Sequence, residues 1–431
     1  MIVIFIILLI IIVVFNYYYH NREICSPSII FAFSFLFSSI FALFYYKEYS
    51  LQLSIKTILI ITLGVISFSL GCIVLKTKKI KENNEIKITE IKINNIMLII
   101  FLMFSIVSLI YSLFQELNAV GGNISNIGLS LYKYRNMATF NNIDLNISPI
   151  VEVLTGILHA SAYWFLLVLI NNYLYNKKIN IKILLITIVC AISNLLDGAR
   201  GGIVNFLFSI IPITYLISIN YKNNNFDKKG INWRIVITTS LVGIIMVLGL
   251  KYSAKLLGRI DTKNISNKEY IGMYTCAPLK NFDTFVRDFN NTKVEKIFGI
   301  HTFHNIYKLF GIDTTNTINN YTFSSVNGNN LGNVSTILFS FLADAGIIGI
   351  ILLSFLMGAF CQIAYNKSNK YEKNIHKFVI RVLIYSYIFG SIFFSYFSNQ
   401  FCSSVLSLGF VRYIIMWIIL NYIFIARQEQ I

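Results

Sequence analysis

The sequence KYSAKLLGR, residues 251–259, opens the longest polar run of the chain. The run ends at Ser335, and an apolar segment flanks it on each side, residues 235–250 before it and 336–364 after it. Similar apolar segments recur along the chain in lengths of about 20 residues, enough to cross about 30 Å of hydrocarbon as a helix. The pattern therefore predicts a membrane protein in which residues 251–335 form one large loop outside the bilayer.

The composition indicates the same class. Of the 431 residues, 56% are apolar, 15% are aromatic and only 13% are charged, and the mean hydropathy is +0.67, which does not describe a soluble chain. A transmembrane β-barrel would instead show weak alternation over about ten residues. Helices satisfy all their backbone groups within uninterrupted apolar runs. The sequence therefore predicts an all-α polytopic membrane protein that forms a single integral domain, residues 1–431.

The net charge of +17 does not indicate nucleic-acid binding. No soluble basic domain holds this charge, because the lysines lie in links between apolar segments, where they orient a membrane protein. The six cysteines show no CxxC or paired spacing, so the sequence predicts neither a disulfide framework nor a metal site. No cofactor is expected.

The basic links determine the expected topology, because links rich in lysine and arginine stay in the cytoplasm. This rule places residues 115–148 outside as a first external loop and residues 251–335 outside as the large one. About eleven spans and an external N-terminus follow. The spans are residues 2–19, 28–46, 56–75, 93–114, 149–170, two short helices within 183–219, 235–250, 336–364, 378–396 and 404–425.

The early part of this topology has an alternative. Lys47 and Lys56 would lie outside, whereas only Arg22 lies in the first inner link, so the positive charges there do not follow the rule. A miscount of one early span remains open from the sequence.

The apolar stretch 183–219 is interrupted by Asp197-Gly198-Ala199-Arg200-Gly201-Gly202. We expect two short helices that meet at this hexapeptide on the outer side. Asp197 and Arg200 then form a polar site between half-helices, and the glycines let a ligand approach the backbone closely. A tight outer turn with a local ion pair explains the same residues equally well.

Other ionisable residues at membrane depth are expected to be paired, because an isolated charge there is costly. Asp344 lies between small residues near the start of its span, and it contacts either a ligand or a buried cation such as Arg412. Glu152 and His159 are seven residues apart on one helix face. We interpret these two residues as interhelical hydrogen-bonding groups.

A cationic face begins the large external loop. Lys251, Lys255 and Arg259 are spaced four residues apart and therefore share one side of a helix. One interpretation is that these long side chains only extend from a helix end toward water. Their place on the outer side, where positive charge near spans is disfavoured, favours phosphate binding instead.

Further along the loop, an amphipathic patch and two histidines follow. Phe282, Phe285 and Phe289 give the patch an apolar side, which predicts helices that lie along the membrane interface. His301 and His304 come next. A histidine near pH 7 is able to take a proton from an attacking hydroxyl, although a loop histidine is also often only solvated.

Several of these pieces together resemble the oligosaccharide repeat-unit polymerases of bacterial surface polysaccharide synthesis, the Wzy or O-antigen polymerase family. The resemblance covers residues 193–359 and depends on the order of the pieces and the size of the loop. The first four spans match in hydropathy only. The pieces are GARGG (198–202), YIG (270–272), FDTF (282–285), FGIHTF (298–303), GNVST (332–336) and ADAGIIG (343–349).

The resemblance implies a metal-independent, inverting glycosyltransferase in the bacterial cytoplasmic membrane. Such an enzyme moves a growing glycan from undecaprenyl pyrophosphate onto a new lipid-linked repeat unit at the outer face, to make O-antigen or capsule. Arginines of the external loops would hold the anionic substrate, and Arg135, Arg200 and Arg259 are the matching residues. Expected partners are the lipid-linked oligosaccharide, the bilayer, a chain-length regulator and a flippase.

The residues also fit this chemistry on independent grounds. Departure of a pyrophosphate requires positive charge on the leaving oxygens, which arginines supply well through bidentate contacts. A carboxylate favours the developing cationic sugar, and the acceptor hydroxyl needs a base. The expected catalytic residues are Arg135, Arg200, Asp197 and His304, and the expected substrate-binding residues are Lys251, Lys255, Arg259, His301 and Asp344.

Three alternatives remain open. An O-antigen-type ligase would share this architecture and differ in its acceptor. A flippase for lipid-linked oligosaccharide would have shorter loops, so the large loop argues against it. A transporter of a small solute would more usually show an internal repeat, which the sequence lacks.

Overall fold

The computed structural model describes residues 1–77, 90–140, 143, 145, 147–196, 198, 200–225, 267–289, 297–314, 324–370 and 374–425. Within these residues the one sheet is a hairpin of β1 (Ser325–Val326) and β2 (Asn329–Asn330). Nine helices of the described residues are long and apolar enough to cross a membrane, which confirms the all-α polytopic class. They are α1 (Ile2–Tyr19), α2 (Pro27–Phe44), α3 (Ile55–Val74), α4 (Asn95–Ala119), α6 (Pro149–Asn176), α8 (Gly201–Asn225), α14 (Ile337–Asn369), α15 (Ile375–Phe393) and α17 (Leu408–Ile425).

Shorter elements connect these helices. They are η1 (Ile124–Asn126), α5 (Ile127–Arg135), η2 (Asn136–Phe140), α7 (Ile181–Ile192), η3 (Ser193–Leu195), α10 (Asn267–Thr275), α11 (Ala277–Arg287), α12 (His304–Leu309), η4 (Phe394–Tyr396) and α16 (Gln400–Val405). The stretch 183–219 is divided as expected, because α7 and η3 end at Leu195 and α8 begins at Gly201. The expected span at residues 235–250 lies outside the described residues, so the count of eleven stays a prediction.

The chain divides into two compact units. Unit 1 comprises Met1–Lys79, Ser266–Lys367 and Ile388–Phe410. Unit 2 comprises Ile80–Ile265, Ser368–Tyr387 and Val411–Ile431.

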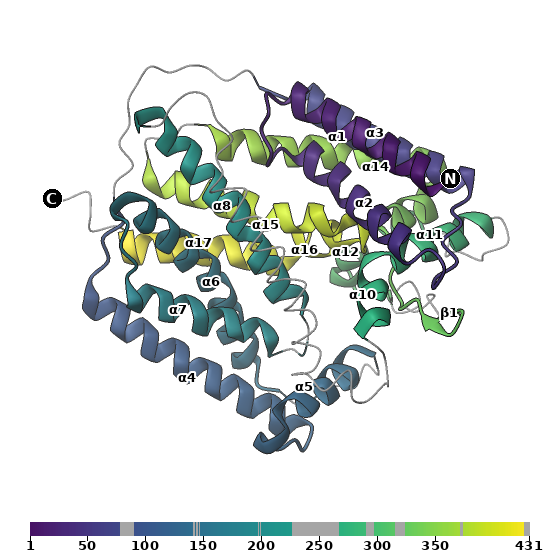
Figure 1. Cartoon of the computed structure of the whole chain (residues 1–431). Coiled ribbons are helices and arrows are strands. Elements are labelled where there is room, and N and C mark those ends of the chain that lie inside the picture. Colours follow the sequence, from purple (N-terminus) through teal and green to yellow (C-terminus); the bar gives the residue numbers. More distant parts are fainter. Residues whose placement is uncertain are drawn as a thin grey trace. The chain divides into compact units, whose positions relative to one another are not determined.

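Close contact between α3 and α14 forms the core of unit 1. A Cβ atom at Gly71 would lie 2.1 Å from the Phe355 carbonyl oxygen, and one at Gly358 would lie 2.1 Å from that of Phe68. Only glycine permits this helix spacing, as is common between membrane helices. Phe31 of α2 stacks on Phe68 with ring centroids 4.1 Å apart, and Figure 1 shows α1, α2 and α3 grouped on one side of the unit.

One end of unit 1, here called its loop end, joins the link between α2 and α3 to the large loop. Tyr49 donates a hydrogen bond to the Glu269 carbonyl oxygen at 2.9 Å, and the Ser54 amide donates to Asp283 Oδ1 at 2.8 Å. Residues 45–54 therefore lie on the same side as α10 and α11, as the expected topology requires.

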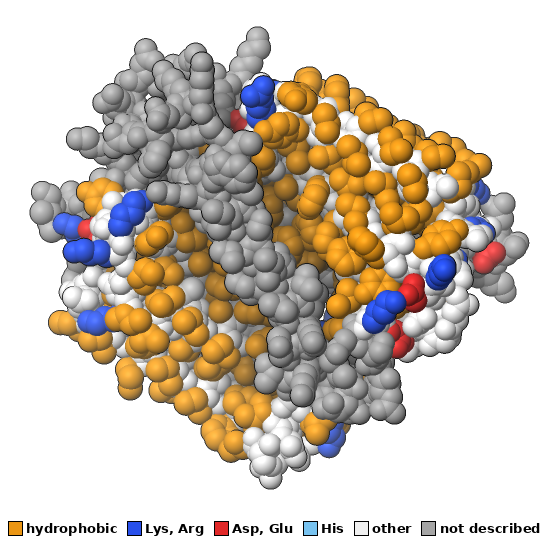
Figure 2. Space-filling model, in the orientation of Figure 1, with side chains coloured by type: hydrophobic (Ala, Val, Ile, Leu, Met, Phe, Trp, Pro, Cys, Tyr) orange, Lys and Arg blue, Asp and Glu red, His pale blue; other side chains and the backbone are white. Residues whose placement is uncertain are grey.

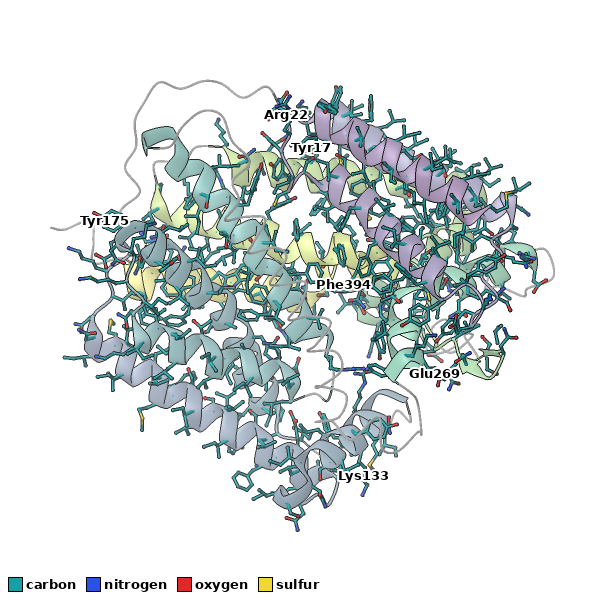
Figure 3. All side chains as sticks on the ribbon, viewed as in Figure 1. Tyr17, Arg22, Lys133, Tyr175, Glu269 and Phe394 are labelled. Carbon is teal, nitrogen blue, oxygen red and sulfur yellow. The ribbon has the colours of Figure 1, made fainter. Side chains whose placement is uncertain are left out.

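The opposite end of unit 1 gathers the other links. Tyr365 donates to Glu23 Oε2 at 2.7 Å, and Asn366 donates to the Leu75 carbonyl oxygen at 2.7 Å. Arg22 lies at this end and Glu269 at the loop end, as labelled in Figure 3. The C-terminal ends of α1, α3 and α14 thus share one side of the unit.

The apolar face of α11 is buried inside unit 1. Leu279 and Phe282 are fully buried, and the Phe285 ring lies 4.3 Å from that of Phe339 between centroids. We expected this face to lie along a membrane interface. It packs on α2, α3 and the start of α14 instead, because the sequence pattern of an amphipathic helix does not reveal whether protein or lipid covers its apolar side.

Unit 2 also has two distinct ends. At the basic end, Lys182 donates to Asn95 Oδ1 at 3.2 Å, and Asn176 donates to Glu90 Oε1 at 3.0 Å, so the starts of α4 and α7 meet the end of α6. Figure 3 shows Tyr175 at this end and Lys133, on α5, at the other. The lysines of the 177–182 link therefore lie at the opposite end from α5.

The sides of both units are apolar. Exposed side chains on α1 include Ile4, Ile7 and Ile11, and those on α4 include Ile100 and Met103. In Figure 2 such side chains cover the flanks of the helices, whereas lysines and arginines lie mainly near the helix ends. This distribution suits a protein whose flanks face hydrocarbon.

Candidate anion site at the glycine break

The turn from η3 into α8 is tight because of its small and polar residues. Asn194 is buried, and its side-chain amide donates to the Cys190 and Ala191 carbonyl oxygens, each at 3.3 Å. A Cβ atom at Gly202 would lie 2.9 Å from Asn194 Oδ1. The start of α8 therefore packs directly against the end of η3.

Gly198 brings α5 onto this turn. Its φ of +59° lies in the left-handed region, and a Cβ atom there would be 2.5 Å from the Leu131 carbonyl oxygen of α5. Arg135, at the end of α5, donates from Nη1 to the Gly198 carbonyl oxygen at 3.2 Å. Two candidates that lie in separate parts of the sequence, Arg135 and the glycine break, thus meet in unit 2.

Arg200 lies at the start of α8. It is 5% exposed, and its carbonyl oxygen accepts the first hydrogen bond of the helix from the Val204 amide at 3.1 Å. The amides of Gly201 and Gly202 belong to the first turn and have no partner within the helix. A Cβ atom at Gly201 would meet nothing within 4 Å, so open space lies beside this helix start.

The electrostatics of this turn favour an anion. The start of a helix carries a partial positive charge, and its first amides point at any group bound there. The Arg135 guanidinium, which donates to the Gly198 carbonyl oxygen, adds formal positive charge, and Arg200 immediately precedes α8 in the chain. Arginine suits the bidentate binding of phosphate oxygens. The arrangement is able to hold a phosphate or diphosphate group.

Four other residues that the sequence predicted for the substrate site are not part of the described structure. Asp197, Lys251, Lys255 and Arg259 lie outside the described residues. The roles expected for them stay predictions.

A second polar cluster, in unit 1, contains the loop histidines. The carboxylate of Asp344 accepts hydrogen bonds from the His301 amide at 3.0 Å and the Thr302 amide at 2.7 Å. The side-chain amide of Asn399 donates to the carbonyl oxygens of the same two residues, at 3.2 and 3.0 Å. Burial lowers the pKa of the nearby His304 below its usual value, and a hydrogen bond with the His301 backbone partly opposes this.

Asp344 therefore uses both oxygens on backbone amides. It lies immediately before a break in α14, where Ala345 has φ −146° and Gly346 has φ +60°. We expected a ligand or a buried cation as its partner, so this role was missed. Asn399 was missed as well, and its only signal in the sequence is a short polar run between two apolar spans.

The interpretation of Glu152 and His159 is confirmed. Both lie on α6 and bond to α17, Glu152 in an ion pair with Arg412 and His159 through Nδ1 to the Tyr413 hydroxyl at 3.2 Å. Arg412 is thus the partner of Glu152.

An apolar groove of about 320 Å³ lies elsewhere, on the flank of unit 1 between α3 and α14. It contains none of the candidate polar residues. Its lining residues are Ser67, Leu70, Ile348, Ile351, Leu352 and Phe355.

Comparison of the chain with known protein families, curated proteins and solved structures gives no match. The function is therefore argued from the geometry of the glycine break.

Proposed function

We propose that this protein is a membrane glycosyltransferase that polymerises lipid-linked oligosaccharide repeat units, and that the glycine break of unit 2 binds the pyrophosphate of the lipid carrier. The observation that carries this proposal is the hydrogen bond from Arg135 to Gly198 at 3.2 Å. This bond joins Arg135, at the end of α5, to a residue two positions before Arg200 in the glycine break.

In the proposed reaction, a hydroxyl of the new repeat unit attacks the anomeric carbon of the growing glycan. The bond from that carbon to the pyrophosphate oxygen breaks, and the carrier leaves with the electron pair. Positive charge at the leaving oxygens lowers the barrier, and removal of one such preorganised donor typically costs about 10²–10³ in rate. Arg135 and Arg200 supply this charge in the proposal. The hydroxyl proton passes to a base, a role for which His304 stays the residue predicted from the sequence.

The ends of unit 2 support an outer location for this reaction. The lysines of the 177–182 link lie at the opposite end from Arg135 and Gly198. Links rich in lysine stay in the cytoplasm. The glycine break would then face the cell exterior or periplasm, where lipid-linked repeat units are polymerised in the family that the sequence resembles.

Reconstitution tests the proposal. Purified protein in vesicles would receive undecaprenyl-pyrophosphate-linked repeat units from the organism that encodes it, with no other protein present. We expect chains of several units, and we expect Arg135→Gln and Arg200→Gln to lower the rate of chain growth by about 10²-fold or more. Lys133→Gln is the matched control, because Lys133 lies on the same helix but donates to the Val120 carbonyl oxygen; it should keep normal growth.

Other outcomes would identify the alternatives. Movement of the lipid-linked unit across the bilayer without chain growth would indicate a flippase. Transfer only to a different acceptor would indicate a ligase. Normal growth in both arginine variants would remove the glycine break from the site.

A further inference from the structure

Residues 297–312 carry an exposed apolar surface outside the nine helices described as candidate spans. Phe310 is 79% exposed, and the stretch also includes the six-residue helix α12. So many large apolar side chains in a short extramembrane stretch indicate a binding surface rather than ordinary solvent exposure. The exposed residues are Ile297, Phe298, Ile306, Leu309, Phe310 and Ile312.

Hydrogen bonds to α14 fix the position of residues 297–312 along the length of that helix. His301 and Thr302 bond to Asp344, three residues before Ile347. Exposed apolar side chains of α14 begin at that point, and Ile348 is 73% exposed. From Ile347 to Tyr365, which lies next to the opposite end of the unit, the helix has 19 residues. At 1.5 Å per residue this is about 28 Å, close to the thickness of the hydrocarbon.

Asp344 therefore lies at the edge of the hydrocarbon on the loop-end side, and the bonded stretch lies at the same level. A second contact agrees, since Asn305 donates to the Ser403 carbonyl oxygen at 2.6 Å, shortly before α17 begins. Along the long axis of α14, the exposed side chains of residues 297–312 thus lie next to the first exposed apolar side chains of that helix.

The backbone of this stretch is satisfied in the way that a membrane edge requires. His301 and Thr302 are not helical, and both are buried. Their two amides bond to the Asp344 carboxylate and their two carbonyl oxygens to the Asn399 amide, so none of these four groups needs water. Irregular backbone near hydrocarbon is tolerated only when its polar groups are paired in this manner. The amides in turn stabilise a carboxylate that would be costly if isolated.

We propose that residues 297–312 form an interfacial segment whose apolar side chains insert into the hydrocarbon edge of the membrane, and that Asp344 and Asn399 hold it there. The partner of this surface is the acyl-chain region of the lipids. Lys308, exposed on α12, suits the anionic headgroups above it. The segment anchors the loop end of unit 1 to the bilayer, independently of any catalytic role.

Cysteine labelling in lipid nanodiscs tests the proposal, because nanodiscs leave both faces of the membrane open to a water-soluble maleimide. All six native cysteines are buried and free, so the wild type gives the background. Lys268→Cys is the water-exposed control, since the Lys268 side chain is 66% exposed at the loop end. Phe310→Cys and Leu309→Cys should react at least about tenfold more slowly than this control, because a nonpolar medium raises the pKa of a thiol and the thiolate is the reacting form.

Fluorescence identifies what covers the segment. Phe310→Trp adds tryptophan fluorescence to that of the wild type. Lipids that carry a nitroxide near the top of the acyl chain should quench this added emission strongly. Adding Asp344→Asn should weaken this quenching while the protein still elutes as a monodisperse peak. Labelling of Phe310→Cys at the control rate would overturn the proposal. Slow labelling without lipid quenching would also overturn it, because protein, from this chain or a second copy, would then cover the segment.

Discussion

Replacement of Gly198 by alanine tests the packing on which the candidate site depends. The left-handed φ of +59° costs a residue with a Cβ atom about 1–2 kcal/mol. That atom would also lie 2.5 Å from the Leu131 carbonyl oxygen, which belongs to backbone and cannot move aside without α5. Displacement of α5 breaks the hydrogen bond from Arg135, worth about 1–3 kcal/mol for a charged donor. We expect Gly198→Ala to destabilise the protein by about 2–5 kcal/mol.

Thermal unfolding in detergent micelles measures this change, as a fall of roughly 2–5 °C in the midpoint for a chain of 431 residues. Gly201→Ala is the matched control from the same hexapeptide, because its Cβ atom would meet nothing within 4 Å. Replacing glycine there is expected to be neutral or to stabilise by about 0.4–1 kcal/mol. Equal midpoints for Gly198→Ala and Gly201→Ala would refute the contact between α5 and the glycine break.

Two further changes test unit 1. Asp283→Asn should destabilise it by about 2–4 kcal/mol in the same assay, because this buried carboxylate accepts hydrogen bonds from the Ser54 amide and the Thr57 hydroxyl. Glu48→Gln is the control. It removes an ion pair at the surface and should leave the midpoint unchanged. Burial lowers the pKa of His20 to about 4 in the folded protein. The unfolded chain therefore protonates at this histidine at a higher pH than the folded chain, and the stability should fall as the pH drops from about 6.5 to about 4. His20→Asn should reduce this loss of stability by about 2 kcal/mol. Unfolding midpoints of both proteins at about pH 7 and about pH 4.5 measure the difference. An equal loss in the variant and the wild type would contradict a buried, neutral His20 ring.

The fold class was predictable because it depends on local properties. Each span is a long apolar run, and several of the links between spans are short and basic. The break before Gly201 was predictable for the same reason, since glycines and two charges cannot continue an apolar helix through its middle. The packing of the large loop was not predictable in this way, because the sequence of an amphipathic helix does not identify the surface on which its apolar side packs. Leu279 and Phe282 of α11 could face lipid or protein, and they are buried in protein.

The candidate site was predictable only in part. Arg135 and Arg200 were each identified from the sequence, but their meeting depends on how α5 packs, and no local pattern reports a contact between residues 63 positions apart. Asp344 shows the same limit. A carboxylate near hydrocarbon must have a partner, yet its residue type does not tell a cation from the amides of His301 and Thr302, which are its partners in the structure.

The most direct test of the central claim is the affinity of the protein in nanodiscs for undecaprenyl pyrophosphate, with undecaprenol as the matched lipid that lacks phosphate. If Arg135 and Arg200 hold the diphosphate, Arg135→Gln and Arg200→Gln should each raise the Kd by about 10–100-fold, as expected for loss of a charged hydrogen bond, and undecaprenol should not compete. An unchanged Kd in both variants, or equal competition by undecaprenol, would contradict an anion site at the glycine break.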